Sequence, residues 1–197
     1  MTPRSYQLGK RIQAAEHTRR RIIEATFELH NEKGVVATSI QDIAARADVA
    51  PHTVYRYFPT IDELVGACGQ HVMAILDPPG PGIFVGIDDR AARIRMLVTQ
   101  MFAMYERGAR QIEVARCQQH EIDALAGAVN AWGQHQESLV REVLRPFRVS
   151  AAQRQAISAL TDFYVWKAFA DRGISTQRAA ATVADTALAQ LNSAMAR

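Results

Sequence analysis

The sequence has few cysteines, few aromatic residues and no long apolar run. Its 197 residues include two cysteines, and because Cys68 and Cys117 form no close pair, neither a disulfide framework nor a zinc motif is indicated. No apolar stretch is long enough to cross a bilayer, and the polar N-terminus lacks the apolar region of a signal peptide. We therefore expect a cytoplasmic protein without membrane contact.

Motifs of catalysis are also missing. The chain has no glycine-rich phosphate loop, no nucleophile elbow and no metal-type motif of histidine and glutamate. We accordingly predict no enzyme activity, no catalytic residue, no metal and no cofactor. A metal site built from Cys117, His120 and Glu121 is kept as a lesser alternative, because its fourth ligand is missing.

Charge is distributed unevenly along the chain. The formal net charge is only +3 and the pI about 9.1, but residues 1–21 hold six basic residues against a single acidic one, Glu16. An N-terminal cluster of this kind is typical of segments that bind phosphates. We interpret residues 1–17 as a basic arm that can be partly helical, with a solvated tail as the alternative. The basic residues are Arg4, Lys10, Arg11, Arg19, Arg20 and Arg21.

Apolar spacing and helix-end signals predict an all-α protein of about nine helices. The first helix is expected over 18–34. Ser39 and Asp42 have capping-box spacing before a second helix, and Pro51 is suited to the first position of a third. Asp48 lies in the turn between them, where a left-handed backbone is often needed and aspartate tolerates it.

Further breaks divide the rest of the chain. Thr60 and Glu63 have capping-box spacing at the start of a fourth helix that reaches about Ile75, and the stretch from Pro78 to Gly82 is the strongest break in the sequence. We expect five more helices, of which the fourth runs unbroken from Ser150 to Gly173. They are separated by Gly108, a break near Gln119, Pro146 and Gly173.

Three helices in about forty residues, with a tight turn between the second and third, are typical of a helix-turn-helix. The fixed residue types lie in Thr38–Ala44, Asp48–Ala50, Thr53–Phe58 and Asp62–Leu64. In this combination the segment resembles the DNA-binding domain of the TetR family, the tetracycline-repressor-like bacterial regulators. The resemblance implies a DNA-binding domain at 18–66 and a helical ligand-binding and dimerisation domain at 67–197.

The outward face of the third helix is the expected DNA contact, because a recognition helix reads bases with residues near its N-terminus. Thr53 offers a hydroxyl and a methyl group, Tyr55 a phenol for a phosphate oxygen, and Arg56 two donors for guanine. For Tyr55 and Tyr57 the alternative is packing on the domain surface. The candidate DNA-binding residues are Thr38, Gln41, Pro51, His52, Thr53, Tyr55, Arg56 and Tyr57. The expected core residues of this segment are Ile40, Ile43, Ala44, Val49, Val54 and Phe58.

The segment departs from the family pattern at three positions. Asp48 stands where glycine is usual, and Ala50 stands where a small polar residue usually caps the third helix. Ile61 replaces a lysine that often contacts phosphate in the family. The basic segment can compensate for that missing cation through Arg19, Arg20 or the residues before them.

The second half of the chain is expected to hold an effector pocket and a dimer interface. The small residues Ala180, Ala184 and Ala187 allow close helix approach, and the resemblance implies that the last two helices of two subunits form a four-helix bundle. The alternative is that this face packs within its own subunit. Methionine and aromatic residues suit an adaptable apolar pocket, but at helical spacing they serve a core at least as often. The candidate ligand-binding residues are Met101, Tyr105, Arg116, Trp132, Phe163 and Trp166.

These features predict a ligand-responsive transcriptional regulator that binds double-stranded operator DNA as a homodimer. Release of a repressor from a palindromic operator by a small-molecule effector is the favoured mechanism, and activation stays open. The alternatives are a ligand-independent accessory DNA-binding protein and, less favoured, a metal sensor.

Overall fold

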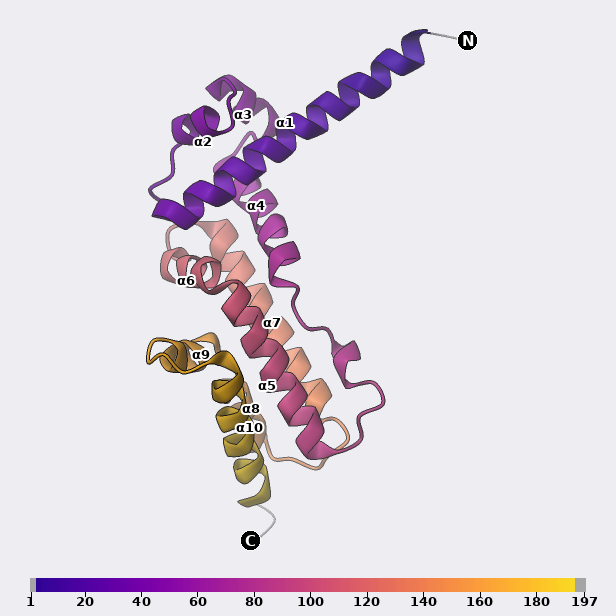
Figure 1. Cartoon of the computed structure of the whole chain (residues 1–197), viewed down its shortest axis with the longest axis vertical. Coiled ribbons are helices and arrows are strands. Elements are labelled where there is room, and N and C mark those ends of the chain that lie inside the picture. Colours follow the sequence, from indigo (N-terminus) through magenta and orange to yellow (C-terminus); the bar gives the residue numbers. More distant parts are fainter. Residues whose placement is uncertain (1–2, 194–197) are drawn as a thin grey trace. The chain divides into compact units, whose positions relative to one another are not determined.

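The computed structural model describes residues 3–193, which form ten α-helices and one 3-10 helix, and it contains no strand in that range. The predicted all-α class is therefore confirmed (Figure 1). In chain order the elements are α1 (Pro3–Lys33), α2 (Ile40–Arg46), α3 (Pro51–Tyr57), α4 (Ile61–Leu76), η1 (Pro81–Phe84), α5 (Arg90–Arg107), α6 (Ala109–Gln118), α7 (Asp123–Leu144), α8 (Ala151–Leu160), α9 (Phe163–Ala170) and α10 (Thr176–Ser193).

The chain folds into two compact units. The N-terminal unit comprises Met1–Ala74 with Arg110–Val129, and the C-terminal unit comprises Ile75–Ala109 with Asn130–Arg197. Among the described residues, no helix has the length and apolar character needed to cross a membrane.

Helix α1 is longer than expected, because it begins at Pro3 and not near Thr18. The segment before Thr18 has no apolar stripe, which is why periodicity did not reveal it. Proline is favoured at the start of a helix, and the lysine, arginine, glutamine and alanine residues that follow are good helix formers. The residues interpreted as an arm are therefore helical from Pro3 onward.

The core of the N-terminal unit joins α1, α2, α3 and α4. Ile22 and Val54 have no exposed surface, and Ile43 and Ala44 are almost as deeply buried. All six predicted core residues of this segment are confirmed, five as buried members of this core and Val49 as a partly buried neighbour packed against it. This core fixes the two short helices, which alone are too short to be stable in water.

The turn between α2 and α3 has the predicted left-handed residue. Asp48 has a φ of 50°, and Arg21 of α1 donates to its main-chain carbonyl at 3.0 Å and to the Ala47 carbonyl. Pro51 begins α3, and Ala50 supplies no side-chain cap to that helix, both as expected. The Ser39–Asp42 capping box is present at the start of α2.

In the C-terminal unit, α10 packs against α5, α8 and α9. The buried guanidinium of Arg93 on α5 donates to the main-chain carbonyls of Val143 at 3.0 Å and Glu142 at 2.6 Å in α7. It also donates to the carbonyls of Phe84 and Ile87, at 3.2 and 3.0 Å. Because buried carbonyls need a donor, this one side chain joins α5, α7 and the η1 segment.

The expectation of one helix from Ser150 to Gly173 is wrong, because α8 ends at Leu160 and α9 begins at Phe163. Thr161 lies at the break without exposed surface, and its carbonyl accepts a hydrogen bond from the Tyr105 hydroxyl at 2.9 Å. Asp162 caps α9 by accepting from the Tyr164 amide at 2.9 Å. No glycine or proline marks this break, which the local Asp162 cap and the tertiary hydrogen bond from Tyr105 form together.

We expect Asp48→Ala to destabilise the protein by about 1 kcal/mol, because a left-handed backbone is strained for alanine. Asp48→Gly removes the same carboxylate but relieves the strain, so it should unfold at or above the wild-type urea concentration. Urea unfolding followed by circular dichroism measures both. Equal losses in the two variants would assign the effect to the carboxylate instead of the backbone.

Candidate nucleic-acid interface

Helix α3 presents an exposed face built from four of the candidate DNA-binding residues. Pro51, His52, Tyr55 and Arg56 are exposed, whereas Thr53 and Tyr57 are half-buried. Tyr55 is 52% exposed, so its ring is available to a partner, whereas Tyr57 packs partly against the core. The helix contains no acidic residue, and a face with donors and without carboxylates suits an anionic partner.

Two arginines are held beside the C-terminal end of α3. The Arg56 guanidinium lies over the Tyr57 ring, 5.3 Å from its centroid, and the Arg19 guanidinium lies at the same distance from the Phe58 ring centroid. Such stacking limits side-chain freedom without using the donors in the guanidinium plane. These donors can therefore still bind phosphate or a base edge.

The two candidate DNA-binding residues near the start of α2, Gln41 and Thr38, differ in their suitability for binding phosphate. Gln41 is exposed in the first turn of α2, where its amide can reach a phosphate. The Thr38 hydroxyl donates to the Gly34 carbonyl at 2.7 Å. Because a phosphate oxygen only accepts, Thr38 is a poor phosphate ligand in this conformation.

Ion pairs join α1 to α2. Arg46 contacts Glu32 through two parallel bonds of 2.9 Å and Glu28 at 3.1 Å, and the Lys33 ammonium lies 2.6 Å from an Asp42 carboxylate oxygen. The hydrogen bond from Lys33, followed by those from Ser39, lowers the pKa of Asp42 well below its usual range.

The positioning roles of Arg21 and Arg46 were not predicted from the sequence. The spacing of Glu28 and Glu32, one turn apart on α1, is a sequence signal that pointed to a cationic partner for that face. Nothing in the spacing of residues pointed to the contact between Arg21 and the turn.

A neutral histidine lies inside the N-terminal unit. His30 of α1 and Cys68 of α4 approach to 3.8 Å between Nδ1 and Sγ. Burial lowers the pKa of His30 to about 4 and raises the pKa of Cys68 to about 12. At neutral pH both groups are uncharged, so the thiol is not a reactive thiolate.

His30 should make stability fall as the pH falls. Its folded-state pKa of about 4 lies below the ordinary value of 6.5, so the unfolded chain takes up the proton first as the pH decreases. The free energy of unfolding should therefore fall by about 2 kcal/mol between about pH 7 and pH 5. Urea unfolding at several pH values measures this loss, and His30→Gln should remove most of it. An unchanged slope in that variant would contradict the assignment.

In the C-terminal unit, aromatic candidates for ligand binding gather around Tyr105. The centroid of its ring lies 5.6 Å from that of Phe163, 6.3 Å from Trp166 and 6.4 Å from Trp132. Met101, Tyr105 and Phe163 have no exposed surface, which is the behaviour of a packed core. Arg116 lies on α6 in the N-terminal unit, so it is not part of this cluster.

Trp132 differs from the other rings in having an unsatisfied donor. Its indole Nε1 is buried and has no hydrogen-bond partner within the described structure. By contrast, the Trp166 Nε1 donates to the Thr176 hydroxyl at 3.1 Å. An unpaired buried donor is costly, and it marks a position where an acceptor on another molecule would be stabilised.

We expect Trp132→Phe to lower stability less than Trp166→Phe, by about 1 kcal/mol. Both variants replace an indole of the same cluster by the smaller phenyl ring. Only Trp166→Phe breaks a hydrogen bond, whereas Trp132→Phe removes a donor that is already unpaired. Denaturant unfolding of the two variants gives the comparison. Equal losses would mean that the Trp132 donor is satisfied.

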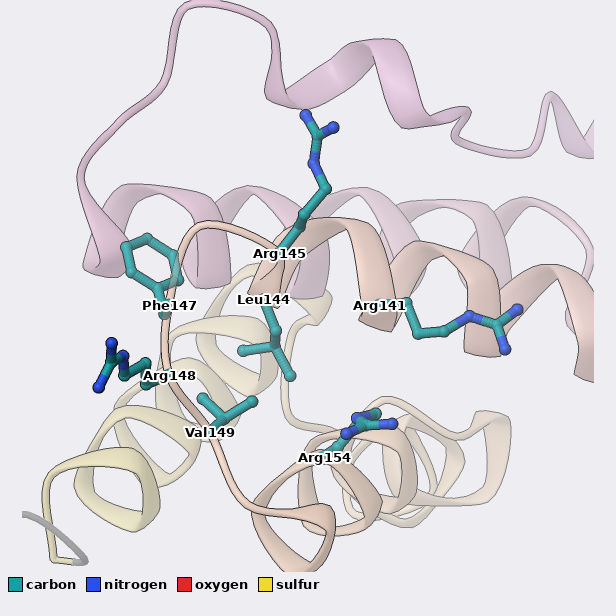
Figure 2. Close-up of a pocket in the computed structure, with 7 residues that line it drawn as sticks. All are labelled: Arg141, Leu144, Arg145, Phe147, Arg148, Val149 and Arg154. Atoms are coloured by element: carbon teal, nitrogen blue, oxygen red, sulfur yellow. The ribbon is translucent and has the colours of Figure 1, made fainter.

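A pocket of about 360 Å³ lies where α7 leads into α8, and no candidate ligand residue lines it. Figure 2 shows Leu144 and Val149 pointing toward each other, while Arg145 and Arg148 extend away on different sides. The guanidinium groups of the arginines that line this pocket do not converge on one point, so we do not assign the effector to it.

The small-residue face of α10 packs within its own unit. Ala180, Ala184 and Ala187 are buried where α10 lies against α5. The residues expected at the dimer interface are therefore buried within the subunit, which favours the alternative interpretation of that face. An interface through α10 would have to use its opposite face.

The metal-sensor alternative gains no support. Within residues 3–193, no three histidine, cysteine, aspartate or glutamate side chains lie close enough to hold a metal ion. Cys117, His120 and Glu121 are all exposed near the end of α6, but they do not form such a group.

Two short helices around a tight turn, packed on α1 and followed by α4, form a helix-turn-helix DNA-binding domain. Residues 22–68 match the model of the bacterial regulatory proteins of the tetR family. This N-terminal domain is therefore similar to the DNA-binding domain of tetR-family regulators.

Curated relatives match in the same region. Over 51 residues the chain is 49% identical to the HTH-type transcriptional repressor Rv3405c of Mycobacterium tuberculosis and to the HTH-type transcriptional regulator Mb3439c of Mycobacterium bovis. These residues are 26% of this chain and 27% of either relative. The match thus spans about a quarter of the length of the curated relatives.

Solved structures share the fold over most of the chain. A tetR-family transcriptional regulator from Streptomyces coelicolor has a TM-score of 0.64 at 17% identity, covering 89% of this chain and 80% of that one. A TetR-like transcriptional regulator from Rhodococcus has a TM-score of 0.63 at 21% identity, covering 87% and 93%. The multidrug binding protein EbrR, solved with imidazole, has a TM-score of 0.64 at 17% identity, covering 88% and 89%.

Proposed function

We propose that this protein is a transcriptional repressor that binds a palindromic operator in the cytoplasm as a homodimer and is released by a small-molecule effector. The observation that carries the proposal is the exposed, carboxylate-free face of α3, which offers Tyr55 and Arg56 from a rigid scaffold. A helix of this kind reads base edges in the major groove. Repression is favoured because a relative that is 49% identical in this domain is named as a repressor.

Dimerisation is proposed because a single DNA-binding domain contacts only half of a palindromic operator. One helix-turn-helix covers one half-site, and two copies reach half-sites that lie one helical turn, about 34–36 Å, apart on the DNA. The last helices of the chain, α8, α9 and α10, are the proposed contact between copies. The face of α10 that would take part is the one opposite Ala180 and Ala184, which carries small and polar residues such as Ala181 and Thr182.

The effector is proposed to bind beside the half-buried Trp132, at the edge of the aromatic cluster around Tyr105. The unpaired Nε1 of Trp132 supports a ligand with a flat apolar body and a hydrogen-bond acceptor, because such a ligand would satisfy the donor and stack on the rings. The structural neighbour EbrR, a multidrug binding protein solved with imidazole, is consistent with a ligand of this kind. The effector releases DNA only to the extent that it binds the DNA-free conformation more tightly than the DNA-bound conformation.

The proposal is tested by selecting a site from a random duplex pool and measuring affinity for it. We expect a palindromic sequence, bound by two copies of the chain. Arg56→Ala should weaken binding by roughly 10- to 100-fold and relax the preference at one base pair in each half-site. Tyr55→Phe should weaken binding to all sequences alike, since it removes a phosphate contact.

The control is Arg148→Ala, which removes an exposed arginine from the loop between α7 and α8 and should leave affinity unchanged. Recovery of no preferred sequence, or normal binding by Arg56→Ala, would contradict the assignment of α3 as the recognition helix.

A further inference from the structure

The N-terminal half of α1 extends beyond the rest of its unit. Figure 1 shows this part of the helix projecting past α2 and α3. Between Gly9 and His17 every side chain is exposed except that of Ala15, which is half-buried. Ile12 is 56% exposed, and no second large apolar residue lies in that stretch. The segment therefore has no stripe for packing against a protein core.

The start of this projection lies beside the recognition helix. Arg21 contacts the turn that precedes α3, and Arg19 lies over the ring of Phe58, which caps the end of α3. Arg21 and Arg19 thus contact the turn before α3 and the residue that follows its last turn. The residues before Arg19 lead outward from the proposed DNA-binding surface.

Helical register places the cations of the projection toward the side of α1 that carries Arg21, the residue that contacts the turn before α3. At about 100° per residue, Lys10 lies about 20° around the helix from Arg21, and Arg11 about 80° from it. The acidic Glu16 lies about 140° from both Arg11 and Arg21. Lys10 is about 16 Å further along the helix axis than Arg21. A cationic strip therefore continues from the turn before α3 along the projection.

We propose that the N-terminal half of α1 binds the phosphate backbone of DNA that flanks the half-site read by α3. This inference rests on the proposed operator binding. It is supported by charge complementarity and by continuity with the α3 surface. A protein partner would need an apolar stripe that the segment lacks. Flanking DNA needs only the cations and their spacing.

The test uses the full chain and two duplexes that carry the site recovered by selection. One ends at the borders of the palindrome, and the other has about ten further base pairs on each side, roughly one helical turn. The variant Lys10→Gln/Arg11→Gln removes two charges and keeps good helix formers. Its matched control, Arg141→Gln/Arg148→Gln, removes two exposed charges from the C-terminal unit.

On the long duplex, Lys10→Gln/Arg11→Gln should bind about tenfold more weakly, and the slope of log K against log salt should fall by about 0.9 for each phosphate that the variant no longer neutralises. On the short duplex it should match the wild type, and the control should match on both. Equal weakening on both duplexes, or none on the long one, would overturn the inference. Failure of the wild type to bind either duplex would instead contradict the proposed function.

Discussion

The guanidinium of Arg21 holds the turn between α2 and α3, and the position of α3 depends on this contact. The turn needs a left-handed residue, and Asp48 adopts that conformation at a φ of 50°. Two consecutive carbonyls, those of Ala47 and Asp48, face the same donor. Because an arginine has several donors in a fixed plane, one side chain of α1 can fix both peptide groups and so set the direction in which α3 begins.

The core and the ion pairs contribute to this arrangement in different ways. Ile22, Ile43 and Val54 are buried almost completely, and burial of such side chains is worth roughly 1.5–3 kcal/mol each. The pairs of Arg46 with Glu28 and Glu32 are partly exposed, and exposed pairs contribute about 0–1 kcal/mol. The apolar contacts thus stabilise the domain, while the arginines select the register at which α2 and the following turn lie on α1.

Features that depend only on neighbouring residues could be predicted from the sequence. The capping box at Ser39, the left-handed Asp48 and the helix start at Pro51 depend on neighbouring residues, and all three were predicted. The break at Thr161 combines the Asp162 cap with a hydrogen bond from the Tyr105 hydroxyl. The apolar spacing continues across the break, and Tyr105 is far away in the sequence, so periodicity predicted one continuous helix.

The candidate sites likewise divide into one that local sequence could predict and others that depend on distant contacts. The exposed face of α3 follows from helical period and a local motif. The aromatic cluster around Tyr105 required tertiary information. Sequence spacing could not separate the packed Phe163 from Trp132 with its unpaired donor, nor place Arg116 in another unit. The burial of Ala180 and Ala184 is a related case, since small residues permit close approach without specifying which helix approaches.

The helical form of the N-terminal segment has an energetic consequence for any anionic partner. A disordered basic tail loses backbone freedom of about 1–2 kcal/mol per residue when it becomes ordered on binding, which offsets much of the gain from each phosphate contact. A helix that continues α1 has already fixed that backbone, and its cations stand at set distances from the α3 surface. The cost falls instead on helix formation in the free protein, where Pro3 and the good helix formers reduce it. Preorganisation of this kind raises affinity without new contacts, so a continuous helix is the more effective way to carry the cations of residues 1–21 to a rigid, regularly charged surface.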